Sequence, residues 1–422
     1  MKFLRVGVCA LAGFAVLAFG GVYDWARAVL ETGAGLLFLI WAVRFYFREN
    51  EKPVFSPLLP PLTGFSLVVL GQWFFRASVS PFHTRIELQL LLAIFILLFL
   101  AGQAFTTLED WRGFVWFGMT LGFFVSFFGI LQHLTFNGKL YWFWEPRYAG
   151  VPFGPFGNRN HFAGFAELVF PLALVPLVLG RVRRERVLVV GLFAVLPVAA
   201  LLLSASRGGI VSFCVQLGVL AFLALRRRGL GKPLFAAVAV LLAALLMVSW
   251  LGVGQILQRF SSMQSLEVTG GKRAAMRQGA WRMFLGHPLA GTGLGTLQIA
   301  YPPYETLYDG KIVNHTHNDY LEALAETGIL GGLCCAWFFA ALVRKSFARL
   351  RHNDDSFAAA LQLSGMVACT GLLVHALVDF NFHIPANLLL FFLMAHLATA
   401  EMQQSPPRRR SRGGNAGREI SD

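Results

Sequence analysis

Apolar stretches of about 17 to 24 residues alternate with short polar segments along most of this chain. A helix of that length crosses a hydrocarbon core of roughly 30 Å, and it satisfies its own backbone hydrogen bonds there. The pattern therefore predicts an all-α, polytopic integral membrane protein with about twelve transmembrane helices. The predicted spans are centred in 4–22, 28–47, 57–75, 86–105, 113–135, 161–180, 187–203, 208–225, 233–253, 320–343, 358–378 and 385–401.

Composition supports this class. Of the 422 residues, 56% are apolar and 14% are charged, whereas water-soluble domains are roughly 45–50% apolar and about 25% charged. The net charge of +14 could indicate nucleic acid binding, but the basic residues cluster in alternate loops. By the positive-inside rule these loops and both termini lie in the cytoplasm, so no nucleic acid partner is expected. The clusters fall near residues 2–5, 44–52, 181–186, 226–232, 344–351 and 408–412.

We expect a single transmembrane helical domain over residues 1–401, followed by a disordered basic cytoplasmic tail over 402–422. The first apolar run resembles a signal peptide, but retaining it as a span keeps every later basic loop on one side. The periplasmic loop over about 254–319 is rich in apolar residues, so we expect it to be folded, with a helix from Gly271 to Gly286. The cysteines all fall within predicted spans, so we expect buried thiols and no disulfide.

Unusual polar residues gather at the outer ends of the predicted spans, although they come from distant parts of the sequence. Basic residues on that face are contrary to the positive-inside tendency, so we expect them to have a local role that offsets it. They are Arg159 and His161 before the sixth span, Arg207 between the seventh and eighth, Arg273, Arg277, His315 and His317 in the long loop, and His375, Asp379 and His383 between the last two spans.

Two histidines, an amide and a carboxylate lie where the long loop enters the tenth span. From His317 the pattern runs His-Asn, nine residues, glycine, two residues, glycine, and this spacing resembles the signature of the O-antigen ligase and O-antigen polymerase superfamily. The Ser-Arg-Gly-Gly element at 206–209 and the stretch 277–295 are also similar to that superfamily. Together the matches cover roughly residues 150–390.

Arg207 could be a helix-end side chain that reaches lipid headgroups, or it could bind phosphate. A guanidinium offers two parallel hydrogen bonds to phosphate oxygens, and Gly208 and Gly209 permit close backbone approach. The resemblance favours phosphate binding. Because a diphosphate needs more than one cation, Arg277 is the expected second ligand, and Arg273, one helical turn earlier, could replace or supplement it.

His317 is the candidate catalytic residue. With an ordinary pKa near 6.5, a histidine can accept the proton of a sugar hydroxyl at neutral pH. Asn318 or Asp319 could fix its tautomer or could cap the tenth span, and we expect Asp319 to be the cap. His315 could hydrogen-bond a phosphate or the acceptor, and its role stays open.

Supporting residues are expected around this pair. Glu326 matches the superfamily's Ala-Glu-Thr-Gly pattern and is expected to support His317 from below. Glu31 and Glu167 lie inside predicted spans and are functional candidates for that reason, although helix packing could equally explain them. The other supporting candidates are His315, Asn318, Arg159, His161 and Asp379.

A metal site could be assembled from the outer histidines and carboxylates. However, the sequence has no His-Glu-x-x-His, no cysteine ligand pair and no Asp-x-Asp, so we expect no metal. The glycines of 291–295 do not form a dinucleotide-binding fingerprint, because the third glycine has the wrong offset and no strand precedes them. We interpret them as a tight turn, and no cofactor is expected.

The resemblance implies an inverting, metal-independent glycosyltransferase of a bacterial inner membrane, with its site facing the periplasm. The donor would be a glycan linked to undecaprenyl diphosphate, and the acceptor a lipid A core or a second carrier-linked glycan. The single long outer loop before the His-Asn motif favours a ligase over a polymerase or a protein O-oligosaccharyltransferase. A polysaccharide or lipid transporter would instead place its polar residues near the middle of the membrane.

Overall fold

The computed structural model describes residues 2–47, 52–145, 151–228, 231–252, 263–308, 310–352 and 357–403. Within these ranges the chain is almost entirely helical, and its β-type contacts are isolated bridges such as that between Leu140 and Trp144. The predicted tail over 402–422 falls almost wholly outside the described residues. The all-α prediction is therefore confirmed for the part of the chain that the structure describes.

Each of the twelve predicted spans coincides with a helix. Eight described helices are long and apolar enough to cross a membrane, and α3, α15 and the 235–250 part of α9 are shorter apolar helices. The polytopic membrane class is thus confirmed. The helices are α1 (Lys2–Leu17), α2 (Asp24–Tyr46), α3 (Leu59–Phe74), α4 (Pro81–Ala104), α5 (Leu108–Leu134), α6 (Arg159–Val178), α7 (Val187–Leu203), α8 (Arg207–Arg228), α9 (Gly231–Gly252), α13 (Asp319–His352), α14 (Phe357–His375) and α15 (Pro385–Thr399).

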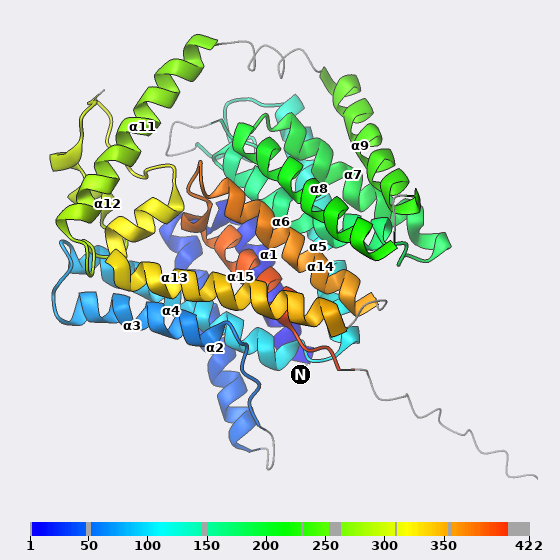
Figure 1. Ribbon diagram of the computed structural model, residues 1–422, viewed down its shortest axis with the longest axis horizontal. Coiled ribbons are helices and arrows are strands. Elements are labelled where there is room, and N and C mark those ends of the chain that lie inside the picture. Colours follow the sequence, from blue (N-terminus) through cyan, green and yellow to red (C-terminus); the bar gives the residue numbers. More distant parts are fainter. Residues whose placement is uncertain are drawn as a thin grey trace, which may run out of the picture.

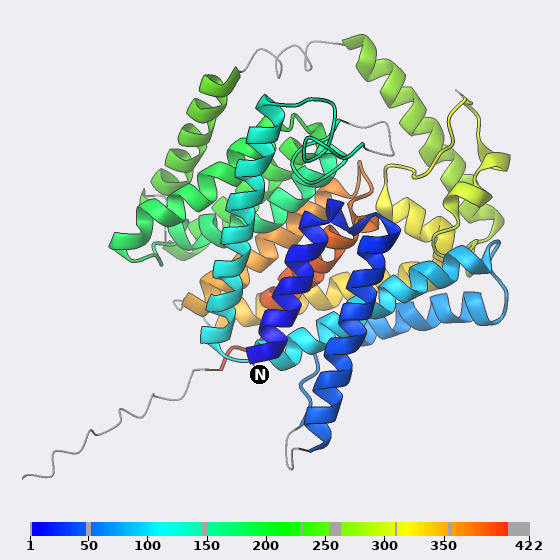
Figure 2. The same ribbon diagram turned by 180° about the vertical axis from the view of Figure 1, so that it is seen from behind.

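The helices form two groups that meet at α15. In one group α3, α4 and α13 run side by side, and in the other α6, α8 and α14 do so (Figure 1). Helix α15 contacts members of both groups. From behind, α1 and α2 run antiparallel across the molecule (Figure 2). This arrangement brings the start of α13 next to the end of α14.

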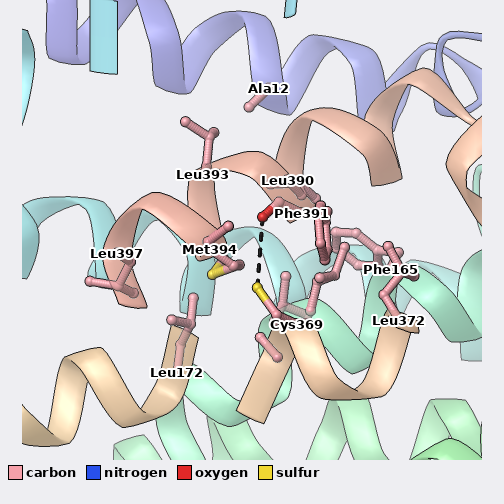
Figure 3. Close-up of a cluster of buried hydrophobic side chains, with 14 of the residues drawn as sticks. Ala12, Phe165, Leu172, Cys369, Leu372, Leu390, Phe391, Leu393, Met394 and Leu397 are labelled. Atoms are coloured by element: carbon pink, nitrogen blue, oxygen red, sulfur yellow. Dashed lines mark hydrogen bonds between the residues drawn. The ribbon is translucent and has the colours of Figure 1, made fainter. Parts of the chain in front are cut away.

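The core lies where α6, α14 and α15 meet. Figure 3 shows the Cys369 thiol of α14 directed at the carbonyl of Phe391, with Phe165 and Leu390 beside it. The backbones of α14 and α15 approach closely because residue 365 is glycine: a Cβ there would lie 2.6 Å from the carbonyl oxygen of Met394. Small residues at helix interfaces permit this close packing in membranes.

Side-chain contacts group the helix ends into two faces. At one face Arg5 of α1 pairs with Asp110 of α5, and Arg349 of α13 pairs with Glu401 after α15. At the other, the backbone N–H of Asp319 donates to the carbonyl of Ala376 at 2.9 Å. We call this second end the site face. The contacts at the first end bring the start of α1 to the start of α5, and the end of α13 to the residues after α15.

Large apolar side chains are exposed along α2, α8 and α9, as expected for surfaces that face lipid rather than water. Cys214 of α8 lies on such a surface, so the prediction that every cysteine is buried is wrong for this residue; Cys369 is buried, and Cys9, Cys334 and Cys335 are partly buried. Its helix is hydrophobic on more than one side, and the sequence pattern cannot tell a lipid-facing position from a core position. All five cysteines are free, as predicted.

The segment before α13 is folded against the site face. It contains α11 (Met263–Gly286), α12 (Leu297–Ala300) and the short helix η3 (Pro302–Tyr304). The predicted helix is confirmed and begins earlier than expected, at Met263. Buried residues of α11, α12, α13 and the chain between α12 and α13 form a small separate core: Ala280, Met283, Leu297, Ala300, Tyr301, Val313 and Ala325.

A break in α13 fixes this segment to the membrane domain. At Gly328 the backbone turns to φ 64° and ψ −166°, which is outside helical geometry. The freed N–H groups of Ile329 and Leu330 donate to the carbonyls of Pro288 and Leu289 at 2.8 and 3.2 Å. The glycines at 291, 293 and 295 all have positive φ, which confirms the predicted tight turn.

Candidate functional site

His317 and Asp379 form a hydrogen-bonded pair at the site face. His317 Nδ1 lies 3.2 Å from Asp379 Oδ1, and the histidine side chain remains 24% exposed while the aspartate is 2% exposed. His317 has a backbone φ of 53°, in the left-handed region that non-glycine residues rarely adopt. Such a conformation persists only where neighbouring contacts enforce it. The pair leaves Nε2 as the ring nitrogen available to a substrate.

Asp379 is held by several donors. Its Oδ1 accepts from the backbone N–H of Phe380 at 2.9 Å, and its Oδ2 accepts from the side chain of Asn160 at the start of α6. Burial alone would raise the pKa of the Asp379 carboxyl, but the hydrogen bond to His317 and the nearby His161 hold that pKa well below its usual range. Asp379 is therefore a carboxylate that can orient His317 and stabilise its protonated form.

A second network surrounds His315. Its Nδ1 lies 2.7 Å from Glu322 Oε1, and the Nε2 of His383 lies 3.2 Å from the same oxygen. The Nδ1 of His383 in turn lies 2.9 Å from Asp319 Oδ1. Burial alone would lower the pKa of His383, but the carboxylates of Glu322 and Asp319 outweigh it and raise that pKa to about 10. His383 is thus a cation that bridges two acids.

The expected cap of α13 is wrong. The side-chain oxygen of Asn318, not that of Asp319, accepts from the backbone N–H of Leu321 at 2.9 Å. Asp319 accepts from the backbone N–H of Phe382 at 3.1 Å and from His383. The local pattern assigned the Asp319 carboxylate to the helix end, but this carboxylate instead binds residues far along the chain.

Phe380 packs against three histidines and was not identified from the sequence. His315 stacks on its ring at a centroid distance of 4.2 Å, and His317 and His161 contact it at 5.0 and 4.7 Å with steeply inclined planes. The ring fixes the relative positions of the two histidine networks. Only its place in Asp-Phe-Asn-Phe-His, between the site residues Asp379 and His383, could have suggested this role.

Arg207 is the first residue of α8, and its helix starts at the site face. The hydroxyl of Ser206 accepts from the backbone N–H of Gly209 at 3.2 Å, which caps this end. A Cβ at residue 208 would lie 2.8 Å from the His375 ring and 2.9 Å from Val378. The close approach predicted for these glycines is thus an approach between helices, and Arg207 lies at a helix N-terminus, where anions are favoured.

Arg273 reaches the same place from α11. Its Nη1 donates to the carbonyl of Val378 at 3.2 Å, and Val378 directly precedes Asp379. Both Arg273 and the start of α8 therefore contact the segment that carries the partner of His317. Arg277 follows one turn later on α11 and is partly buried.

The other predicted residues have varied positions. His161 is buried below Phe380, and Arg159 begins α6 with its backbone N–H bonded to the carbonyl of Val151 at 2.8 Å. The carboxylate of Glu326 accepts from the backbone N–H groups of Gly295 and Leu297 at 2.9 and 2.8 Å. Glu326 thus secures the tight turn, and these bonds take the place of the expected contact with His317.

The two intramembrane carboxylates both have basic partners. Glu31 Oε1 lies 2.9 Å from Nε of Arg27, whose Nη1 lies 2.8 Å from Glu87 of α4. Glu167 of α6 lies 2.8 Å from Nδ1 of His375, and both side chains are fully buried. The Glu31–Arg27 pair lies within α2, the Arg27–Glu87 pair joins α2 to α4, and the Glu167–His375 pair joins α6 to α14.

The described residues include one group that could hold a metal ion: His315, Glu322 and His383, whose ligand atoms lie within 4.8 Å of one another. Each of these atoms already takes part in a hydrogen bond or ion pair. Both histidines lie against the same oxygen of Glu322, so this cluster has the donor chemistry that the chelation experiment tests.

A comparison with known families matches part of the chain. Residues 192–336 match the family model described as O-antigen ligase, and the matched stretch contains Arg207, Arg273, Arg277 and His317. The match confirms the resemblance to the O-antigen ligase and polymerase superfamily. Together with the polytopic fold, it supports a membrane protein of the O-antigen ligase type, which is a glycosyltransferase type. No curated protein matches the chain.

Proposed function

We propose that this protein transfers an O-antigen glycan from undecaprenyl diphosphate to a lipid A core acceptor at the periplasmic face of the inner membrane. The observation that carries the proposal is the meeting of two kinds of group at the end of α14. The His317–Asp379 pair supplies a base, and Arg273 and the start of α8 reach the adjacent Val378. A transfer from a diphosphate needs both.

His317 acts as the general base. Its Nδ1 is engaged by Asp379, so Nε2 takes the proton of the acceptor hydroxyl as that oxygen attacks the anomeric carbon. The buried carboxylate favours the imidazolium that forms. This arrangement follows the logic of acid–histidine pairs in other transferases and hydrolases, in which the acid orients the ring.

The arginines act on the leaving group. As the bond between the anomeric carbon and the diphosphate oxygen breaks, its electron pair stays with that oxygen, and the new charge is stabilised by guanidinium groups. A phosphate bound beside Arg207 is also favoured by the partial positive charge at the start of α8. We assign Arg273 as the nearer loop arginine, because it contacts Val378, and Arg277 as the supplementary one. Attack from the face opposite the diphosphate inverts the anomeric centre.

A transporter explains the site less well. Helix α13 is broken, as transporter helices often are, but the outer segment 288–293 satisfies the freed backbone groups instead of an ion or substrate. The partly exposed histidines His315 and His317 lie just before the start of α13, at one face. The arrangement therefore favours chemistry at the membrane surface.

Transfer by the purified protein tests the proposal. Protein in liposomes is supplied with undecaprenyl diphosphate glycan and lipid A core, and the products are separated by mass. We expect glycosylated lipid A core from wild type and a loss of roughly 30- to 1000-fold for Arg207→Ala. Arg207→Lys should also be poor, because an ammonium cannot replace a two-pronged guanidinium.

The matched control is Arg282→Ala, which removes an exposed arginine of α11 and should leave the rate unchanged. Lengthened carrier-linked glycan, with no product on lipid A core, would make the protein a polymerase. Full activity of Arg207→Ala would refute the diphosphate assignment.

A further inference from the structure

A cavity of about 400 Å³ lies between α3, α4, α13 and α15, next to the histidine network. Its wall is almost entirely apolar and includes Leu62, Leu91, Phe338 and Phe391 from those four helices. Its polar lining residues are Glu87, Asp319, Glu326 and His383, and the last three belong to the networks of the site face.

The size and lining of the cavity suit one hydrocarbon chain. Apolar cavities of this kind exclude water and bind apolar molecules. If a methylene group takes about the liquid volume of a water molecule, roughly 30 Å³, the cavity holds on the order of thirteen of them. That is the size of a fatty acyl chain. An undecaprenyl chain, with eleven isoprene units, is several times too large to be enclosed.

The position of the cavity separates it from the proposed diphosphate site. The cavity begins at Asp319 and His383, which belong to the network of His315. Arg273 instead contacts Val378, beside Asp379 and His317. The histidines therefore lie between the two. A lipid whose chain fills the cavity would present its headgroup to the histidines from the side away from the arginines, which is where an acceptor must be for inversion.

We propose that this cavity is the acyl-chain site of the acceptor, so that the acceptor is an acylated glycolipid held by one of its chains. The inference rests on the proposed function, which supplies the identity of the reaction. It goes further in naming where the acceptor's lipid part binds and in excluding an acceptor without an acyl chain, such as a protein side chain.

Filling the cavity tests the assignment. Ala323 lines it one turn after Asp319 on α13, and Ala323→Phe should raise the KM for lipid A core about tenfold or more while leaving the KM for the donor unchanged. The matched control is Ala340→Phe, which adds the same side chain at an exposed position of the same helix. If Ala323→Phe keeps the wild-type acceptor KM while Arg207→Ala is inactive, the acyl site is refuted and the proposed function stands.

Photocrosslinking tests the site without requiring activity or a variant. Lipid A carrying a diazirine in one acyl chain is bound to wild-type protein and irradiated, and the modified peptides are mapped. Crosslinks to the cavity lining of α13, between Tyr320 and Phe339, are expected, and unlabelled lipid A should suppress them. Suppression by undecaprenyl phosphate but not by lipid A would assign the cavity to the carrier. Crosslinks confined to lipid-facing helices such as α2 would also overturn the proposal.

Discussion

Asp379 follows α14 and is hydrogen-bonded to His317, which precedes α13. This bond joins the two regions of the site that carry histidines. Asp379 was expected to support the site, but nothing in the sequence indicated that its partner is His317, 62 positions away. A contact between residues this far apart depends on helix packing, which local patterns do not encode.

Replacing Asp379 with asparagine should impair transfer without unfolding the protein. The amide keeps the shape, but it cannot stabilise the imidazolium and can hold the wrong tautomer of His317. We expect kcat to fall roughly 10- to 1000-fold with little change in KM. Asn381→Ala is not a suitable control, because Asn381 is buried. His287→Ala is a suitable control, because His287 is exposed. Wild-type kcat in Asp379→Asn would show that the carboxylate only supports the fold.

His383 should make stability depend on pH. Its pKa is raised to about 10 by Glu322 and Asp319, against an ordinary value near 6.5. A raised folded pKa means that the stabilisation is fully present below about pH 6.5 and is lost as the pH rises towards 10. Thermal unfolding of the purified protein should therefore show Tm falling over that interval. In His383→Gln this fall should be smaller, and an equal fall in both proteins would contradict the assignment.

At the scale of helices, the long apolar spans were predictable because a bilayer demands them, whereas the break in α13 was not. Gly328 was recognised only as part of a spacing motif. In the structure, the break at Gly328 frees backbone groups that bond to the segment 288–293. The sequence also misassigned the helix cap, since Asn318 and Asp319 are chemically equivalent candidates when only local spacing is considered.

Gly328→Ala should destabilise the link between α13 and the outer segment. The position has φ 64° with ψ −166°, and a Cβ would lie 2.4 Å from the backbone of Leu289. Backbone strain alone should cost about 1–3 kcal/mol, and the clash adds to it. Proteolysis after reconstitution should then release the outer segment faster. Gly332→Ala is the control on the same helix, because its nearest neighbour is the flexible end of Leu324; equal proteolysis of both variants would argue against the link.

At the scale of the whole molecule, the contacts that group helix ends into two faces give a topology that labelling can test. Single cysteines at Tyr308, in the outer segment, and at Glu185, between α6 and α7, are both at exposed positions. In a cysteine-free background, an impermeant maleimide should label position 308 in intact cells treated to open the outer membrane. Position 185 should react only after the inner membrane is opened. The reverse pattern would place the site in the cytoplasm.

In the proposed mechanism, His317 removes the acceptor proton without help from a metal ion. The direct measurement is the transfer rate of purified wild-type and His317→Ala protein in a buffer with excess chelator, across pH 5 to 9. We expect chelation to leave the wild-type rate unchanged and His317→Ala to lose about 100-fold or more. Loss of the wild-type rate on chelation, with recovery on adding a divalent ion, would instead make His315, Glu322 and His383 metal ligands and contradict the account.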